Sequence, residues 1–315
     1  MRTERINIST PELDEEEHKW WNINALTIEK IWAQTSAMQN AIRKPYLNRM
    51  KKFFQEDNKN QKLSILEVGC GSGWVCRTIA SENIHIIGTD FSEEQLKIAT
   101  QNAKKTNKDQ FCKYELADAS TFQKNFDGVV IHAVLHHLSK QELKTFFEEF
   151  RKLKSGTKVF FYEPLFFNTS TLKASILDRI INRIILFIKS ISLFLAKKLG
   201  STNAPLNNDM NKIFSDAEKN GWYISPKEVP FYEGELESYF DKDFKQVNKY
   251  IVNRTELDIA QSLTLNSQDE KPSFIFTKIL IPISRFFDNL LYKGNFRAFI
   301  PTNSHLFVCF ELIKI

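Results

Sequence analysis

Apolar and polar positions divide the chain into stretches with different periodicities. Between residues 18 and 55, aromatic and aliphatic side chains recur at helical spacing, which predicts two helices. From Leu63 to Pro164, short apolar runs alternate with amphipathic segments, and this pattern is typical of a parallel α/β sheet. After Pro164 the alternation stops. The predicted strands are residues 63–68, 84–90, 111–118, 126–132, 157–163, 244–252 and 305–315.

Helix signals between the strands support this pattern. Ser92 with Gln95 and Ser139 with Glu142 both fit the S/T-x-x-E/Q capping box that begins a helix. The fold predicted is therefore α/β, with a doubly wound, mostly parallel, seven-stranded sheet. The predicted regions are an N-terminal helical lid (1–62), an α/β core (63–164), a helical insertion after the fifth strand (165–240) and a C-terminal part of the sheet with an apolar helix (241–315).

Composition excludes several classes of protein. Hydrophobic residues make up 42% and charged residues 26% of the chain, which is typical of a globular protein and not of a disordered one. The four cysteines form no CxxC or Cys/His metal spacing, so no metal site is expected from them. The N-terminus has no apolar signal segment, and no apolar run approaches the ~18 residues of a membrane span. A cytoplasmic protein with reduced thiols is expected.

The net charge of +5 is too small to indicate a nucleic-acid partner, but its distribution is uneven. Residues 172–199 carry six Lys/Arg and one acid, and residues 274–299 carry four and one. Both segments are also strongly apolar, and the apolar positions of the first form one helical stripe. One interpretation is a cap helix that closes a pocket, which such stripes more often do. The other is peripheral contact with an anionic membrane surface.

A glycine-rich segment follows the first predicted strand. Leu66 to Gly73 reads LEVGCGSG, so three of the ten glycines lie within five residues. Glycines here let the backbone turn sharply and let a ligand approach, and the following helix begins with free N–H groups. A dinucleotide fingerprint would need a third glycine where Trp74 stands, which argues against NAD. An acid two residues before the first glycine suits a ligand with a cationic ammonium group.

This segment and those that follow it resemble the class I S-adenosylmethionine (SAM) dependent methyltransferases. The similarity covers about residues 63–165 and includes GTDFS after the second strand, LADAS after the third, LHHL after the fourth and LKSG before the fifth. The resemblance implies a SAM-dependent methyltransferase with SAM as its cofactor. The residues that it assigns to SAM are Glu67, Gly69, Cys70, Gly71, Gly73 and His132 for the methionine part, Asp90 for the ribose, and Phe91, Asp118 and Ala119 for the adenine.

Three carboxylates support this assignment independently. Glu67, Asp90 and Asp118 stand at the ends of consecutive predicted strands, and these ends face the ligand crevice of an open α/β sheet. A carboxylate that accepts both ribose hydroxyls makes two charge-assisted hydrogen bonds. Taken singly, Asp90 is also explained as a neighbour of a helix cap and Asp118 as a turn residue. Their coincidence favours a ligand site.

The candidate catalytic residues are His136, His137 and Glu163. Methyl transfer from a sulfonium requires mainly alignment and exclusion of water, but an oxygen or nitrogen acceptor must also lose a proton. Three histidines lie within six residues from the end of the fourth strand, where His132 stands, and Glu163 ends the fifth. The alternative is that LHHL is a packing and turn element and that Glu163 orients the following loop. The sequence leaves both interpretations open.

The acceptor is chosen by segments outside the core, because substrate elements are appended to this fold. The leading hypothesis is methyl transfer to an O or N atom of a small, largely apolar or aromatic molecule. A membrane-surface enzyme acting on a quinone- or lipid-like acceptor is an alternative, since Trp20, Trp21 and Arg43 are weakly similar to the O-methyltransferases of ubiquinone biosynthesis. A non-catalytic SAM-binding protein is another. Nucleic acid is disfavoured because no base-flipping motif follows the fourth strand.

Overall fold

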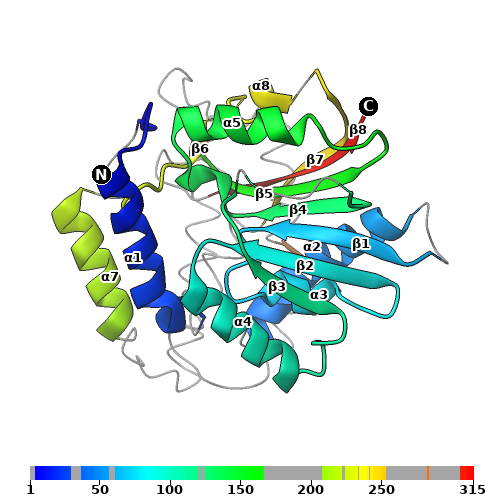
Figure 1. Cartoon of the computed structure of the whole chain (residues 1–315), viewed down its shortest axis with the longest axis horizontal. Coiled ribbons are helices and arrows are strands. Elements are labelled where there is room, and N and C mark those ends of the chain that lie inside the picture. Colours follow the sequence, from blue (N-terminus) through cyan, green and yellow to red (C-terminus); the bar gives the residue numbers. More distant parts are fainter. Residues whose placement is uncertain are drawn as a thin grey trace.

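The computed structural model describes a single mixed sheet with helices on both faces (Figure 1). Within the described part of the chain, no helix is long and apolar enough to cross a membrane. The two basic, apolar segments lie outside this part apart from residues 282–283, so both interpretations of them stay predictions. The structure describes residues 4–29, 37–56, 61–119, 121, 125–166, 208–221, 224–232, 234–240, 242–252, 282–283 and 306–315.

The sheet has the order β3-β2-β1-β4-β5-β8-β7, and the short strand β6 pairs with β5 beside this path. Strands β1 to β5 are parallel, whereas β8 runs antiparallel to both β5 and β7. This confirms the doubly wound, mostly parallel fold, with β6 as an addition that the sequence pattern did not predict. The strands are β1 (Leu63–Val68), β2 (Ile84–Asp90), β3 (Cys112–Leu116), β4 (Gly128–His132), β5 (Lys158–Phe166), β6 (Phe231–Tyr232), β7 (Phe244–Val252) and β8 (Leu306–Lys314).

The helices begin where local capping chemistry allows. Ser139 and Glu142 form the predicted reciprocal capping box, and Ser92 accepts a hydrogen bond from the Gln95 backbone. The acidic residues 12–17 lie in the first part of the first helix, which Thr10 caps. The helices are α1 (Pro11–Ile28), α2 (Ala37–Gln55), α3 (Trp74–Ile79), α4 (Glu93–Lys105), the 3-10 helix η2 (Leu135–His137), α5 (Lys140–Phe150), α7 (Asn208–Asn220) and α8 (Glu237–Phe240).

Alternating side chains of the strands fill two cores, one on each face of the sheet. On one face, aromatic side chains of α5 and α8, such as Phe147 and Phe240, pack against Phe161 of β5. On the other face, Met50 and Phe54 of α2 lie in a cluster with β1, α3 and α4. Figure 1 shows α5 and α8 on one side of the sheet and α2, α3 and α4 on the other.

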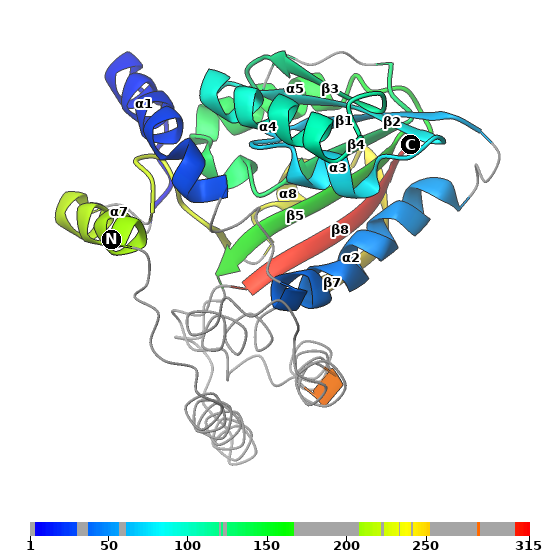
Figure 2. The ribbon, with the colours of Figure 1, turned by 90° about the horizontal axis from the view of Figure 1, so that it is seen from below.

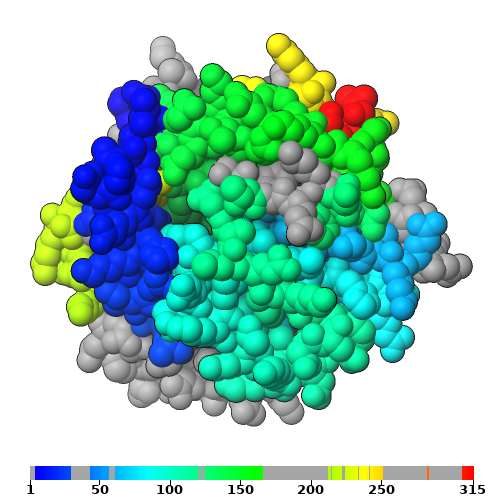
Figure 3. Space-filling model, in the orientation of Figure 1, coloured from blue at the N-terminus to red at the C-terminus, as the bar shows by residue number. Residues whose placement is uncertain are grey.

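Helices α1 and α7 stand apart from these layers and lie side by side (Figures 1 and 2). Trp20 and Ile28 of α1 pack with Ile213 of α7 in a small apolar cluster. Of the two helices in the predicted lid, therefore, α1 lies beside the carboxyl-terminal ends of the parallel strands and α2 packs on the sheet. In the space-filling view, α1 (blue) lies along one side of a hollow, and the core (green and cyan) forms the other side (Figure 3).

Arg5 fastens the N-terminal segment to the turn that contains η2. Its guanidinium donates to the carbonyls of His136 (3.3 Å), Leu138 (3.1 Å) and Val229 (2.9 Å). The same group stacks 4.2 Å from the centre of the Phe231 ring. Because carbonyls of two distant segments accept from one buried guanidinium, the segment around Val229 is held against η2.

Candidate functional site

The glycine loop that follows β1 has a left-handed backbone at each of its three glycines. The φ angles of Gly69, Gly71 and Gly73 are 64°, 51° and 70°, a region that side chains make costly. A Cβ on Gly69 would lie 2.4 Å from Cγ2 of Val134, and one on Gly73 would lie 2.5 Å from the Tyr114 hydroxyl oxygen. The loop therefore needs glycine both for its conformation and for its close contact with β3 and the turn after β4.

Asp90, the last residue of β2, holds this loop in place. Its Oδ2 accepts from the Gly71 backbone N–H at 2.8 Å and its Oδ1 accepts from the Ser92 backbone N–H at 2.9 Å. The residue is only 7% exposed, and burial raises the pKa of its carboxyl, although the two backbone hydrogen bonds oppose this. The structure thus brings together the glycine loop and the acid that the sequence placed at the next strand end.

Glu67 lies under the same loop in a different environment. Cys76 of α3 donates its Sγ–H to Glu67 Oε2 at 2.8 Å, and both side chains are buried. Burial raises the pKa of Glu67 from 4.5 to about 8, although the hydrogen bonds with Cys76 and the charge of Arg77 oppose this shift. A cationic group bound nearby would shift this carboxyl toward its ionised form.

This shift predicts how stability depends on pH. Between pH 4.5 and about 8 the folded state holds a proton on Glu67 that the unfolded state has lost, so the free energy of unfolding falls as the pH rises. We expect Glu67→Gln to reduce this fall, because glutamine cannot ionise. Urea unfolding of both proteins at a series of pH values between about 5 and 8.5 measures the effect. Equal slopes for the two proteins would contradict the assigned environment of Glu67.

The turn after β4 is organised by Glu163, which the sequence made a catalytic candidate. Its Oε1 accepts from the backbone N–H groups of Val134 and Leu135, both at 2.9 Å, and its Oε2 lies 2.8 Å from Nδ1 of His136. The side chain is fully buried. Both oxygens thus contact groups of the turn that contains η2, which precedes Glu163 in the chain, whereas the alternative interpretation gave this residue the loop that follows it. A catalytic role of Glu163 stays a prediction.

His137 of η2 is paired with Glu17, which the sequence pattern did not single out. Nδ1 of His137 lies 3.0 Å from Oε1 of Glu17, and the same oxygen accepts from Ser225 Oγ at 2.9 Å. Burial raises the pKa of Glu17, but the hydrogen bonds from His137 and others outweigh it and leave the pKa below its ordinary value. Burial lowers the pKa of His137, but the Glu17 carboxylate outweighs it and raises the pKa.

The side chain of His132 packs against aromatic side chains. Its ring stacks on Tyr162 with the centroids 4.2 Å apart, and its Nε2 lies 3.3 Å from the Tyr46 hydroxyl. Burial lowers its pKa to about 3, so the side chain is neutral near pH 7. Such a side chain is a poor base, and the expected contribution of His132 to SAM binding, through its backbone, stays a prediction.

The remaining residues of the predicted SAM site lie at the same edge of the sheet. The Phe91 carbonyl lies 3.0 Å from Nε2 of His18 in α1, which places α1 beside the end of β2. The backbone N–H of Ala117 donates to the Asp90 carbonyl at 3.1 Å, so Asp118 and Ala119 follow directly from a residue bonded to β2. Cys70 lies within the loop and is buried, as are the other three cysteines, all free thiols.

Two side chains against the glycine loop carry buried polar atoms with unused hydrogen-bonding capacity. Within the described residues, the amide N and O of Gln95 and the hydroxyl of Tyr114 have no hydrogen-bond partner. Gln95 Oε1 lies 3.7 Å from the position of a Cβ on Gly71, and Tyr114 contacts the equivalent position on Gly73. Unpaired buried polar groups cost free energy, so these atoms fit a loop that receives a polar ligand.

The central segment of the chain is similar to known proteins. Residues 65–156 match a family model described as "Methyltransferase domain". YqeM of Bacillus subtilis (strain 168), a protein that carries a methyltransferase name, is 31% identical over 97 residues, which are 30% of this chain. The match covers 39% of the length of YqeM, so it concerns this segment and not the whole of either protein.

Solved structures share the fold over nearly the whole chain. The [4+2]-cyclase SpnF has a TM-score of 0.54 at 13% identity, with 99% of each chain covered. The geranyl diphosphate C-methyltransferase of Streptomyces coelicolor A3(2) has a TM-score of 0.50 at 11% identity, with 98% of this chain and 99% of that chain covered. Identities this low indicate a common architecture and leave the chemistry to the residues of each site.

Proposed function

We propose, from the match of residues 65–156 to a methyltransferase domain and from the class I fold, that this chain binds SAM and transfers its methyl group. The observation that carries the proposal is the coupling of the glycine loop to Asp90, whose carboxylate accepts from the loop backbone at 2.8 Å. In an open α/β sheet, the crevice beyond the strand ends is where a ligand of this size binds.

The residues at this edge fit the parts of SAM. Each carboxylate oxygen has two lone pairs, so Asp90 retains capacity for ribose hydroxyls while it holds Gly71 and Ser92. Glu67 would face the ammonium group, and the glycine loop would accommodate the carboxylate through backbone N–H groups. Phe91, Asp118 and Ala119 would surround the adenine. SAM supplies the electrophilic methyl group, and the protein's part is to align it with the acceptor and exclude water.

For the acceptor, we propose a small, largely apolar or aromatic molecule bound beside α1 and η2. Trp21 of α1 supports this, because its ring meets that of His137 edge-on with the centroids 5.3 Å apart. An aromatic side chain beside an imidazole would provide an apolar wall and a polar contact together. We propose an O or N atom as the methylated atom. The His136–His137 pair would lie near the proton that this atom must lose. The four free thiols support action in the cytoplasm.

Turnover tests this proposal. The purified chain, SAM with a labelled methyl group and fractionated apolar cell extracts should yield S-adenosylhomocysteine together with one labelled product. Mass spectrometry and NMR of that product identify whether O, N or C carries the label, and C would contradict the O or N proposal. SAM binding without labelled product from any fraction would instead favour a non-catalytic SAM-binding protein.

A further inference from the structure

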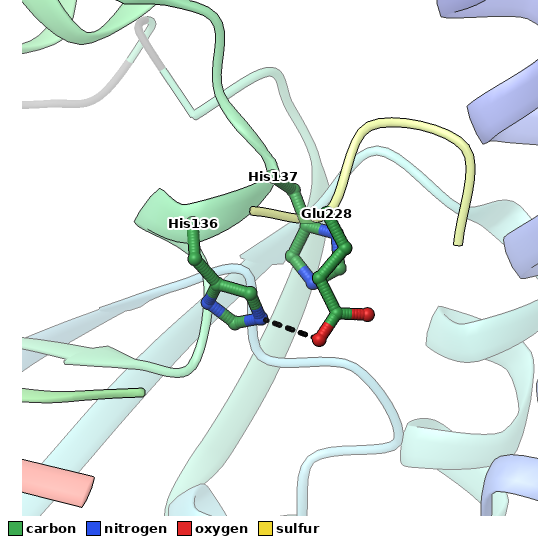
Figure 4. Close-up of side chains that lie close together, drawn as sticks. All are labelled: His136, His137 and Glu228. Carbon is green, nitrogen blue, oxygen red and sulfur yellow. Dashed lines mark ion pairs between the residues drawn. The ribbon is translucent and has the colours of Figure 1, made fainter. Parts of the chain in front are cut away.

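We propose that His136, His137 and Glu228 form a binding site for a divalent transition-metal ion. One ligand atom from each residue lies within 4.8 Å of the other two. Figure 4 shows the two imidazole rings and the Glu228 carboxylate converging, with the histidines on the turn of η2 and the glutamate on a separate segment. Nε2 of His136 lies 3.6 Å from Oε1 of Glu228, farther apart than in a hydrogen bond.

The hydrogen bonds that the two imidazoles make through Nδ1 resemble those of histidines in metal sites. Nδ1 of His136 lies 2.8 Å from Glu163 Oε2, and Nδ1 of His137 lies 3.0 Å from Glu17 Oε1. In metal sites, the ring nitrogen that does not bind the metal almost always donates to a carboxylate, a carbonyl or water. With both Nδ1 atoms engaged in this way, each Nε2 atom is the one left for a metal.

Three carboxyl groups surround the cluster. Glu17, Glu163 and Glu228 are each at least nine-tenths buried, and each lies within 3.6 Å of one of the two imidazoles. Burying carboxylates costs free energy unless a positive charge lies nearby, and a divalent cation between the Nε2 atoms and Glu228 would supply that charge.

The basic side chains near the cluster are engaged elsewhere. Lys227, next to Glu228, directs its Nζ to Asp14 at 2.6 Å and to Glu142 at 2.7 Å. Arg5 donates to three backbone carbonyls and, through Nε, to Glu235 at 3.1 Å. Neither contact neutralises the three carboxylates of the cluster, and Arg5 in addition holds the segment that carries Glu228 against η2.

The donor set selects the class of metal. Two imidazoles and one carboxylate suit Zn²⁺, Co²⁺, Fe²⁺ or Mn²⁺, whereas Mg²⁺ and Ca²⁺ prefer oxygen ligands alone. With metal–ligand distances of about 2.1 Å, neighbouring ligands lie about 3.4 Å apart, so side-chain shifts of about 1 Å would close the site. Three protein ligands leave at least one position for an acceptor oxygen, and this last role rests on the proposed function.

Cobalt titration tests the site on the full chain after removal of bound metal. We expect one equivalent of Co²⁺ to bind with visible d–d absorption, and Zn²⁺ but not excess Mg²⁺ to displace it. Glu228→Gln and His137→Asn should each weaken Co²⁺ binding at least about tenfold, as loss of a ligand does. Glu311→Gln is the control, because it alters an equally buried carboxylate that pairs with Arg49 on another part of the sheet.

Absence of Co²⁺ and Zn²⁺ binding to the wild type would overturn the proposal. So would binding that is unchanged in both Glu228→Gln and His137→Asn, provided that circular dichroism shows them folded. If these variants do not fold, the wild-type spectrum decides: d–d bands without histidine nitrogen ligation in pulsed EPR of the Cu²⁺ form would also overturn it. SAM titration of the metal-free protein separates this result from the proposed function, because the residues assigned to SAM are different ones.

Discussion

Replacing Gly69 with alanine is expected to weaken SAM binding strongly and to destabilise the protein. The residue has a φ of 64°, and a Cβ there would lie 2.4 Å and 2.8 Å from the two Cγ atoms of Val134. Val134 cannot move freely, because its backbone N–H donates to Glu163 at 2.9 Å. Backbone strain and the clash together should lower the free energy of unfolding by about 2–4 kcal/mol. Displacement of the loop should weaken SAM binding at least about 100-fold, a loss of about 2.7 kcal/mol.

Gly156→Ala provides the matched control for Gly69→Ala. Gly156 also has a positive φ, 87°, but no atom lies within 4 Å of the position of its Cβ. The substitution therefore carries backbone strain without a clash, and we expect a loss of about 1 kcal/mol in stability with SAM affinity unchanged. Urea unfolding and calorimetric SAM titration of both variants provide the comparison. Wild-type SAM affinity in Gly69→Ala would contradict the proposed donor site.

Asp90→Ala is expected to give the second large effect. The substitution removes the acceptor of the Gly71 and Ser92 backbone N–H groups and, in the proposed complex, the acceptor of the ribose hydroxyls. Hydrogen bonds to a charged group contribute about 1.5–3 kcal/mol each, so loss of two at the ligand should weaken SAM binding by about 10²-fold or more. Calorimetry measures the affinity.

Asp127→Ala controls for the general effect of removing an aspartate that binds backbone. Oδ2 of Asp127 accepts from the Ser64 N–H at 2.9 Å, and Oδ1 pairs with Lys154 at 3.1 Å. This residue lies at the amino-terminal end of β1, away from the glycine loop, so its loss should leave SAM affinity within about twofold of wild type. Equal weakening by the two substitutions would indicate that Asp90 acts through stability alone.

The fold was predictable wherever a local pattern specifies an element. Strands β1 and β2 match their predicted bounds, because their apolar runs end at glycine and aspartate. Strand β6 has only two residues and forms through pairing of Leu165 with Phe231, so it has no local signal. Helix α7 lies within the predicted helical insertion, where no bounds were predicted for an individual helix. Its contact with α1, through Ile213 and Trp20, is a tertiary feature that propensity does not specify.

The site residues also separate into those with a local sequence signal and those placed by tertiary contacts. Asp90 was identifiable because it ends a strand, and the structure places it against the glycine loop. Glu17 belongs to the acidic run 12–17, and its burial depends on His137, 120 residues away, and on Ser225, 208 residues away. Glu228 likewise meets His136 only because the chain returns to η2 late in the sequence. The Glu17–Trp21 spacing of four residues, with a hydrogen bond of 2.8 Å, was the one local signal for Glu17.

Calorimetric titration of the wild-type chain with SAM tests whether the glycine loop and Asp90 form a donor site. We expect binding at one site, competition by S-adenosylhomocysteine, and clearly weaker binding by Asp90→Ala, because the Asp90 carboxylate holds the glycine loop. No detectable binding of millimolar SAM to folded wild-type protein, with Asp90→Ala indistinguishable from it, would contradict a SAM site at this edge of the sheet.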